Sequence, residues 1–171
     1  MDDAIGNAMQ KEITDAASDK NSVGGVIECA VYGIKPGFGS PFFASVESLI
    51  SSMMFSIPAV KGIEFGRGFD LCSMTGFEAN DPFVTDGEKI FTETNNNGGI
   101  NGGITNGMPI IFSVAIKPTP SIAKVQSTVD TNTMKNTTIS INGRHDPCIV
   151  QRAAVVVECA AALAILESKL I

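Results

Sequence analysis

The stretch "GMPIIFSVAIKP", residues 107–118, decides the fold. A continuous apolar run bounded by glycine and proline is typical of a strand that ends in a rigid turn. Two other segments, "GGVIECAVYGI" at 24–34 and "AVKGIEFG" at 59–66, are also typical of strands. We therefore predict three strands, and we expect the strand at 24–34 to be buried.

Helical spacing of apolar residues marks three further segments. Residues 3–17 and 43–54 each place apolar side chains at intervals of three or four. From Pro147 to about Ser168 the sequence is apolar almost all round, which predicts a helix buried on most sides. The spaced residues are Ile5, Ala8, Met9, Ile13 and Ala16 in the first segment, and Phe43, Val46, Leu49, Ile50, Met53 and Met54 in the second.

The order of the elements favours an α+β fold in one domain spanning residues 1–171. Asp86-Gly87 lies between "PFV" and "KIFTET" and predicts a hairpin. Two more β-like runs follow at 123–130 and 136–142. Helices and strands are therefore mixed along the chain, and they do not alternate regularly as in a parallel sheet.

Composition excludes several classes of function. The chain has 171 residues, 44% apolar and 18% charged, with a formal charge of −6. This charge argues against a nucleic-acid partner but leaves room for a local basic pocket that binds an anionic small molecule. The N-terminus lacks a signal-type apolar core, and the apolar window 153–166 is too short to cross a membrane. We expect a cytoplasmic protein without a membrane partner.

The cysteines point to neither zinc nor disulfides. No C-x-x-C spacing occurs, and His145 is the only histidine. We therefore expect no metal site, and we expect buried thiols in a reducing compartment. The cysteines are Cys29, Cys72, Cys148 and Cys159.

The loop "TNNNGGINGGITNG", residues 94–107, is not ordinary core sequence. Glycine allows positive φ and close approach of backbone amides to a ligand, and asparagine tolerates the left-handed region. Such a loop can present N–H groups to an anion or to an aromatic ring edge. A flexible surface loop of low complexity is the alternative interpretation.

The stretch "AIKPTPSI", 115–122, holds Lys117 between an apolar strand and two prolines. Pro118 and Pro120 fix the chain direction, so Lys117, Thr119 and Ser121 lose little entropy on binding. This suits a preorganised phosphate site. An edge strand that ends in a rigid turn with an exposed lysine explains the pattern equally well.

The stretch "GRHDPC", 143–148, places Arg144 beside the start of the last predicted helix. Asp146 followed by Pro147 predicts an N-cap and a first helical residue. An arginine next to a helix N-terminus is a good anion site, and Asp146 could instead handle protons. We expect His145 to be structural.

Five blocks in fixed order resemble the chorismate synthase family. They are "SVGGVIECAVYGIKPGFGSP" (22–41), "MMFSIPAVKGIEFGRGF" (53–69), "NNNGGINGGITNGMPIIF" (95–112), "IKPTPSI" (116–122) and "GRHDPC" (143–148). The resemblance implies a β-α-β sandwich and a homotetramer. It also implies a carbon–oxygen lyase that eliminates phosphate from 5-enolpyruvylshikimate 3-phosphate, using reduced FMN, to give chorismate for aromatic amino-acid biosynthesis. The flavin would be reduced by an external partner or by a built-in activity that uses NADP.

The resemblance also assigns roles to individual residues. Asp146 matches the carboxylate that helps to relay the C6 proton near the flavin N5. Family motifs that resemble "GESHG" and "HRSSARE" are missing, so we expect the chain to correspond to the C-terminal half of a family member. A non-catalytic flavin- or phosphate-binding fragment, or an assembly module, is therefore the alternative. The implied flavin contacts are Pro58, Ala59, Gly102, Lys117, Pro118, Thr119, Pro120, Ser121 and Arg144.

Overall fold

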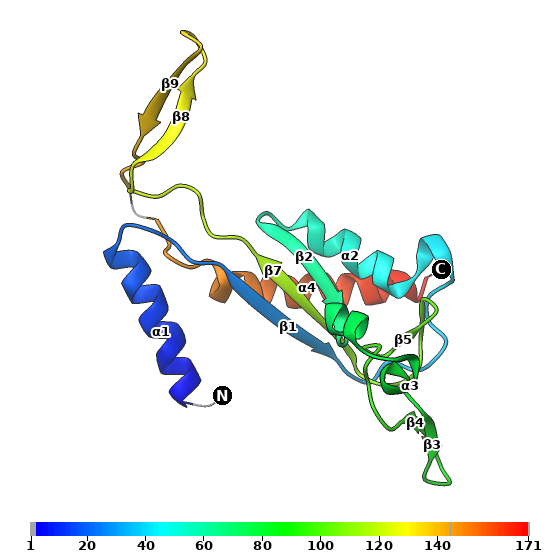
Figure 1. Ribbon diagram of the computed structural model, residues 1–171. Helices are drawn as coiled ribbons and strands as arrows, with labels where there is room; N and C mark the ends of the chain where they lie inside the picture. The colour runs from blue at the N-terminus through cyan, green and yellow to red at the C-terminus, as the bar shows by residue number, and fades with distance from the viewer. Residues whose placement is uncertain (1–2, 144, 171) are drawn as a thin grey trace. The chain divides into compact units, whose positions relative to one another are not determined.

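The computed structural model describes residues 3–143 and 145–170 of a mixed chain of helices and small sheets (Figure 1). Two compact units divide the chain. The first combines the residues up to Gly25 with Lys117–Gln151, and the second combines Val26–Ile116 with the segment from Arg152. The fold is α+β, as the element order predicts.

A three-stranded sheet forms the centre of the second unit. Its strands are β1 (Gly25–Val31), β7 (Ile110–Ile116) and β2 (Val60–Phe65), in the order β1-β7-β2. β2 runs antiparallel to β7, with a register shift between Val60 and Gly62. Ile110, Phe112, Val114 and Ile116 are buried. The period of two along β7 therefore turns one face of the sheet to the core.

Two helices supply the other side of this core. In α2 (Val46–Ser56), the buried residues Val46, Ile50 and Met54 recur every fourth position and so lie on one stripe. Ser45 caps this helix, because its hydroxyl accepts a hydrogen bond from the Ser48 amide at 3.0 Å. In α4 (Val150–Ser168), the buried residues are Val157, Ala161, Ala164, Ile165 and Ser168.

Short elements surround the sheet and shape the loops between its strands. They include two hairpins, β3–β4 and β5–β6, each of antiparallel strands. The bounds are η1 (Phe42–Ala44), η2 (Gly68–Ser73), α3 (Gly76–Ala79), β3 (Phe83–Thr85), β4 (Ile90–Thr92), β5 (Ile100–Asn101) and β6 (Ile104–Thr105).

The first unit holds α1 (Asp3–Ser18) and the antiparallel hairpin of β8 (Gln126–Asp130) and β9 (Lys135–Ile139). No residue of α1 is buried, and every residue of β9 is exposed. The end of α1 is closed by a 6→1 bond from the Asn21 amide to the Ala16 carbonyl at 2.9 Å and a bond from Lys20 to Ala17 at 3.1 Å. This is a Schellman ending with Lys20 at a φ of 55°.

Periodicity predicted the elements correctly but their burial less well. The predicted strands, the hairpin at Asp86-Gly87 and the three helices are all present. The strand at 24–34 is not buried as expected, since Ile27 is the one buried residue of β1. β1 lies at the edge of its sheet, where one strand neighbour is missing.

Three other expectations were wrong. The last helix begins at Val150 and not at Pro147, so Asp146 is not its N-cap. Its apolar residues are covered on one face only, and Val155, Val156, Leu163 and Leu166 are exposed. Cys72 and Cys159 are exposed and the other two cysteines half-buried, so the thiols are not core residues.

No helix among the described residues has the length and apolarity needed to cross a membrane.

Candidate functional site

The glycine- and asparagine-rich loop is held in place by one buried carboxylate. Asp81, which is 4% exposed, accepts four hydrogen bonds. The Thr94 hydroxyl donates at 2.7 Å and the Asn96 amide at 2.7 Å. The Asn97 amide donates at 2.9 Å and the Asn97 side chain at 2.8 Å. The start of the loop is therefore fixed and is not a loosely tethered surface loop.

Glycine is required where this loop meets the sheet. At Gly98 the φ is +63°, and an added Cβ would lie 2.5 Å from the Gly66 amide nitrogen and 2.6 Å from the Ile111 carbonyl oxygen. Gly102, at the turn between β5 and β6, differs because no atom lies within 4 Å of the place of its Cβ. Gly102 is thus the open point of a loop that is otherwise closely packed.

The turn between α2 and β2 holds Pro58 and Ala59. The Val60 amide donates to the Ile57 carbonyl at 3.3 Å, and Ala59 has a φ of +75°. This is the pattern of a type II turn, in which the third position favours glycine. Alanine there costs conformational energy, which is a feature often found at functional sites.

The sheet register relates this turn to the end of β7. Val60, the first residue of β2, is paired with Ile116, the last residue of β7. The turn at 57–60 and the end of β7 therefore share one end of the sheet, and Lys117 is the next residue along the chain. Figure 1 shows β5 at the opposite end of the sheet. The Val46 amide at the start of α2 donates to the Gly103 carbonyl at 3.0 Å, whereas the 57–60 turn follows the end of α2, so Gly102, which precedes Gly103, is not beside that turn.

The segment Lys117–Ser121 leaves the sheet as an extended turn. Lys117 is exposed, whereas Thr119 and Ser121 are half-buried. The Ser22 hydroxyl donates to the Thr119 carbonyl at 2.6 Å, and the Gln126 side chain donates to the Pro120 carbonyl at 3.1 Å. The turn is therefore restrained on both sides, while the Lys117 ammonium faces solvent.

The loop that follows β9 carries the remaining predicted residues. Arg144 lies outside the described residues. Asp146 is half-buried, and it precedes α4 by several residues. The Val23 amide donates to the Pro147 carbonyl at 2.8 Å, and this long-range bond holds Pro147 outside the helix.

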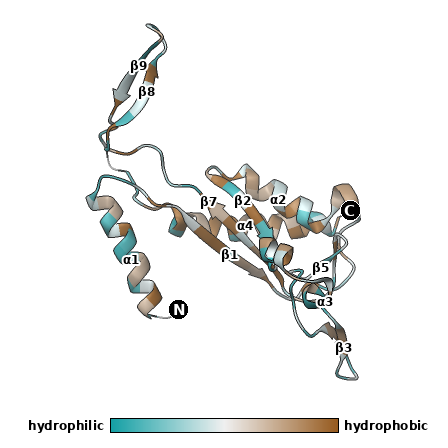
Figure 2. Cartoon of the chain, in the orientation of Figure 1, coloured by the Kyte–Doolittle hydropathy of each residue, from teal (hydrophilic) through white to brown (hydrophobic). Residues whose placement is uncertain are grey.

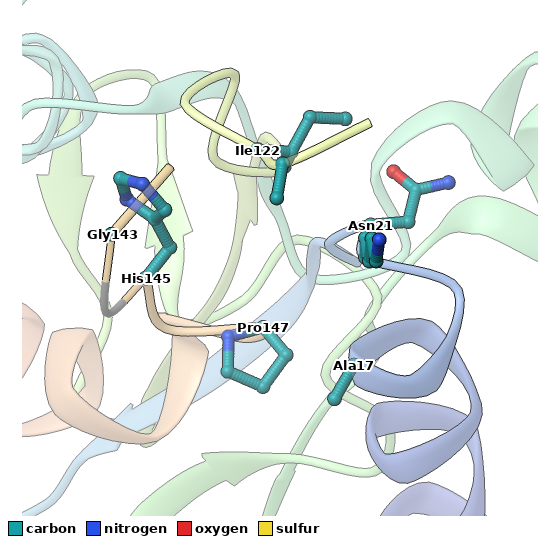
Figure 3. A pocket seen from close by; sticks show the side chains of 8 residues that line it. Ala17, Asn21, Ile122, Gly143, His145 and Pro147 are labelled. Carbon is teal, nitrogen blue, oxygen red and sulfur yellow. The ribbon is translucent and has the colours of Figure 1, made fainter. Parts of the chain in front are cut away.

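A cavity of about 230 Å³ lies within the first unit, next to this loop. Figure 3 shows His145, Ile122 and Pro147 around it, with Ala17 and Asn21 from the end of α1 opposite. The Nε2 atom of His145 is buried and has no hydrogen-bond partner among the described residues. A buried imidazole nitrogen of this kind is normally paired with water or a ligand.

Among the described titratable groups with shifted pKa values, Asp81 and Cys29 are the two for which burial is the first cause. Burial acts to raise the pKa of Asp81, but the hydrogen bonds from Asn97, Thr94 and Asn96 outweigh it and lower that pKa below its usual value. Burial, with a smaller contribution from Glu158, raises the pKa of Cys29. These shifts favour the carboxylate form of Asp81 and the thiol form of Cys29.

Asp81 and Ser22 are the residues that the sequence pattern did not single out. Asp81 stands in "ANDPF" and looks like an ordinary turn residue. Ser22 lies beside a helix end, where serine is common. Their partners are 13 to 16 residues away for Asp81 and 97 residues away for Ser22. No local pattern reveals bonds of that range.

The sheet with helices on one face, the ordered glycine-rich loop and the lysine at the end of β7 define an α+β protein with a candidate site for a phosphate-bearing ligand. A family model described as chorismate synthase matches residues 1–170. The chain belongs to the chorismate synthase family.

Individual relatives agree with this assignment. A chorismate synthase of Thermococcus kodakarensis is 46% identical over 97% of this chain and 47% of its own length. One of Korarchaeum cryptofilum is 51% identical over 93% of this chain and 44% of its own length. A crystal structure of chorismate synthase matches with a TM-score of 0.72 and 32% identity, over 95% of this chain and 41% of that chain. The chain thus spans less than half the length of these relatives.

Proposed function

We propose that this chain carries the flavin- and phosphate-binding part of a chorismate synthase site. The reaction is the 1,4-elimination of phosphate from 5-enolpyruvylshikimate 3-phosphate, which gives chorismate and makes the protein a carbon–oxygen lyase. The observation that carries the proposal is the sheet end where the 57–60 turn meets the end of β7, paired through Val60 and Ile116. At that end the chain continues into Lys117.

The residues that follow β7 along the chain fit a phosphate-bearing flavin. Lys117 is exposed, and the described residues supply no ion pair for it. Thr119 and Ser121 add hydroxyl groups on a turn stiffened by Pro118 and Pro120. A lysine with neighbouring hydroxyls on a fixed backbone is suited to a phosphate group.

Other residues would contact the rest of the flavin. The Pro58-Ala59 turn presents a small side chain held at positive φ. Gly102 leaves open space where a side chain would stand, and because it lies away from that turn it would contact a different part of the ligand. Arg144 is proposed as a further cation for phosphate. When bound, reduced FMN would supply a transient electron source without net redox change.

Asp146 is proposed to hold and pass on the C6 proton while the phosphate leaves. Its carboxylate is half-buried, in the loop that Val23 fixes through Pro147. A positioned carboxylate is a suitable general base or relay for such a proton. The elimination breaks one C–H bond and one C–O bond, forms one C=C bond and releases phosphate.

A second candidate, a binding or assembly fragment without turnover, has its own support in α4. Val156, Leu163, Leu166 and Leu170 are exposed, as is Cys159. At 3.6 residues per turn the four of these positions that lie within α4, namely Val156, Cys159, Leu163 and Leu166, share one face, opposite the buried face of the helix. Leu170 follows the end of the helix. Such an exposed apolar stripe marks an interaction site, and we propose that it packs against the part of the fold that the relatives possess beyond this match. Assembly into a homotetramer in the cytoplasm is proposed by analogy with the family.

The test is to mix the chain with reduced FMN and 5-enolpyruvylshikimate 3-phosphate and to follow chorismate absorbance. A parallel sample adds the N-terminal half of the Thermococcus kodakarensis relative. Turnover in both samples supports the proposal that this chain is active alone. Turnover only in the second sample supports the proposal that this chain is a fragment that needs the other half. Absence of turnover and of FMN binding in both would overturn the proposal.

The role of Asp146 is tested in whichever sample turns over. Asp146→Asn keeps the shape of the side chain but removes its ability to take a proton. We expect the turnover rate to fall by roughly 100-fold while the Kd for FMN stays constant. A second assay replaces the reduced FMN with oxidised FMN and NADPH. Turnover in that assay would show that the protein itself reduces the flavin.

A further inference from the structure

The segment Asn21–Val23, which follows α1, contacts two of the segments assigned to ligand binding. The Ser22 hydroxyl donates to the Thr119 carbonyl at 2.6 Å. The Val23 amide donates to the Pro147 carbonyl at 2.8 Å. Two adjacent residues therefore hold both the Lys117–Ser121 turn and the loop that carries Asp146.

The segment is itself well fixed at its N-terminal side. The Schellman ending of α1 sets the backbone at Lys20 and Asn21. The Asn21 side-chain oxygen then accepts a hydrogen bond from the Ser22 amide at 2.9 Å. Because the backbone at Ser22 is held in this way, its hydroxyl lies within hydrogen-bond distance of the Thr119 carbonyl.

The turn that receives this bond is stiffened by two prolines but has few other hydrogen bonds. Pro118 and Pro120 have no amide hydrogen, so neither can anchor the turn by donation. Among the described residues, the side-chain hydrogen bonds onto 117–121 come from Ser22 and from Gln126. Ser22 is the donor that reaches the carbonyl between the two prolines.

We propose that Ser22 is a positioning residue for the phosphate end of the ligand, an inference that rests on the proposed function. Its hydroxyl fixes the Thr119 carbonyl, and with it the direction of Lys117, Thr119 and Ser121. Through the adjacent Val23 amide, the same segment sets the loop of Asp146 relative to that turn. The binding residues are thus preorganised before the ligand arrives, which reduces the entropy lost on binding.

The experiment measures FMN affinity of the full 171-residue chain by quenching of flavin fluorescence. Ser22→Ala removes the donor, and we expect the Kd to rise about five- to tenfold, the effect of one lost hydrogen bond. Ser22→Thr restores the hydroxyl and should restore the Kd. Ser140→Ala is the matched control, because the Ser140 hydroxyl donates to the Ala123 carbonyl at 2.8 Å, outside the turn. That variant should bind FMN as the unchanged chain does.

A second measurement does not depend on flavin. Without FMN, we expect Ser22→Ala to shift the NMR signals of the Ser121 amide and of His145, whose imidazole is unique in the chain. Ser140→Ala should leave the Ser121 signal in place. Unchanged FMN affinity and unchanged signals in Ser22→Ala would overturn the inference, as would equal effects of both variants. If the unchanged chain binds no FMN, the proposed function fails, and the NMR comparison alone decides whether Ser22 positions the turn.

Discussion

At the residue scale, the behaviour of Lys117 decides between two interpretations of its segment, a turn that binds a ligand and an ordinary strand end. Lys117→Ala should raise the Kd for FMN by roughly 10- to 100-fold, because a charge-assisted contact to phosphate is lost. The free energy of unfolding should change by less than about 0.5 kcal/mol, since the side chain is exposed. Fluorescence titration and urea unfolding measure the two quantities.

The control for this prediction is Lys135→Ala, because Lys135 is another exposed lysine, on β9 of the same unit. It removes the same net charge but lies outside the Lys117–Ser121 turn. Equal weakening of FMN binding by both variants would show that only overall charge matters, and Lys117 would then be a simple surface residue.

Asp81 gives a prediction about stability and pH. Asp81→Asn should lower the free energy of unfolding at pH 7 by about 2 kcal/mol, because a buried acceptor of four donors becomes an amide with one acceptor oxygen. The pKa of Asp81 is lowered in the folded chain. Its contribution is therefore complete above the unfolded-state pKa of about 3.9 and is lost as the pH falls through the lower folded pKa.

Urea unfolding between pH 7 and pH 3 checks this prediction. The difference between the unchanged chain and Asp81→Asn should narrow only at the acidic end. Asp130→Asn is the comparison: the hydrogen bonds from Asn132 and Thr133 also lower the pKa of Asp130, but this carboxylate lies on an exposed hairpin turn, so its gap should be smaller than that of Asp81→Asn. A gap for Asp81→Asn that is constant over the whole range would contradict the assignment.

The two residues differ in how far sequence could reveal them. Lys117 could be placed at a strand end, because the apolar run stops at Ile116 and two prolines follow. Asp81 could not be identified as the anchor of the glycine-rich loop. Its donors come from Thr94, Asn96 and Asn97, and a contact of that range follows from the folded backbone alone.

At the element scale, α2 depends on its N-cap. Ser45→Ala should lower the free energy of unfolding by about 1 kcal/mol, because the Ser48 amide loses its acceptor at 3.0 Å. Ser52→Ala, on the exposed side of the same helix, should leave stability unchanged or raise it slightly, since alanine favours helices. Thermal unfolding followed by circular dichroism measures both. A loss of equal size in the two variants would argue against the cap.

Element boundaries show what periodicity can predict and where it fails. The four-residue spacing of Val46, Ile50 and Met54 indicated α2 correctly. The Asp146-Pro147 pair resembled a helix start, yet α4 begins at Val150. The reason is the bond from the Val23 amide to the Pro147 carbonyl. A local start signal cannot compete with a long-range partner that takes up the same backbone.

At the scale of the whole molecule, α4 has two apolar faces and only one is covered. Leu163→Glu combined with Leu166→Glu should change the free energy of unfolding of the isolated chain by less than about 1 kcal/mol, because both side chains are more than half exposed, at 57% and 56%. The same pair should weaken binding of the N-terminal half of the Thermococcus kodakarensis relative at least tenfold. Two leucine side chains that are no longer buried in the interface lose enough binding free energy to explain a tenfold effect.

Titration calorimetry of the two halves checks this prediction. Ala154→Glu, an exposed position of α4 away from the stripe, is the control and should leave the affinity unchanged. Unaltered affinity in the double variant would remove the stripe from the interface. The apolar residues on the uncovered face of α4 are also why the sequence predicted burial on most sides, a prediction that was wrong. Apolar composition predicts that a helix face will be covered, but it does not show whether the same chain or another one covers it.

The open stripe of α4 has a consequence for the life of the chain in a cell. A row of exposed leucines and valines is the kind of surface that chaperones hold and proteases reach. The steady-state amount of this protein should then follow the supply of whatever covers the stripe, even where its own folding is unchanged. The abundance of the protein would therefore depend on whether α4 is covered by its partner.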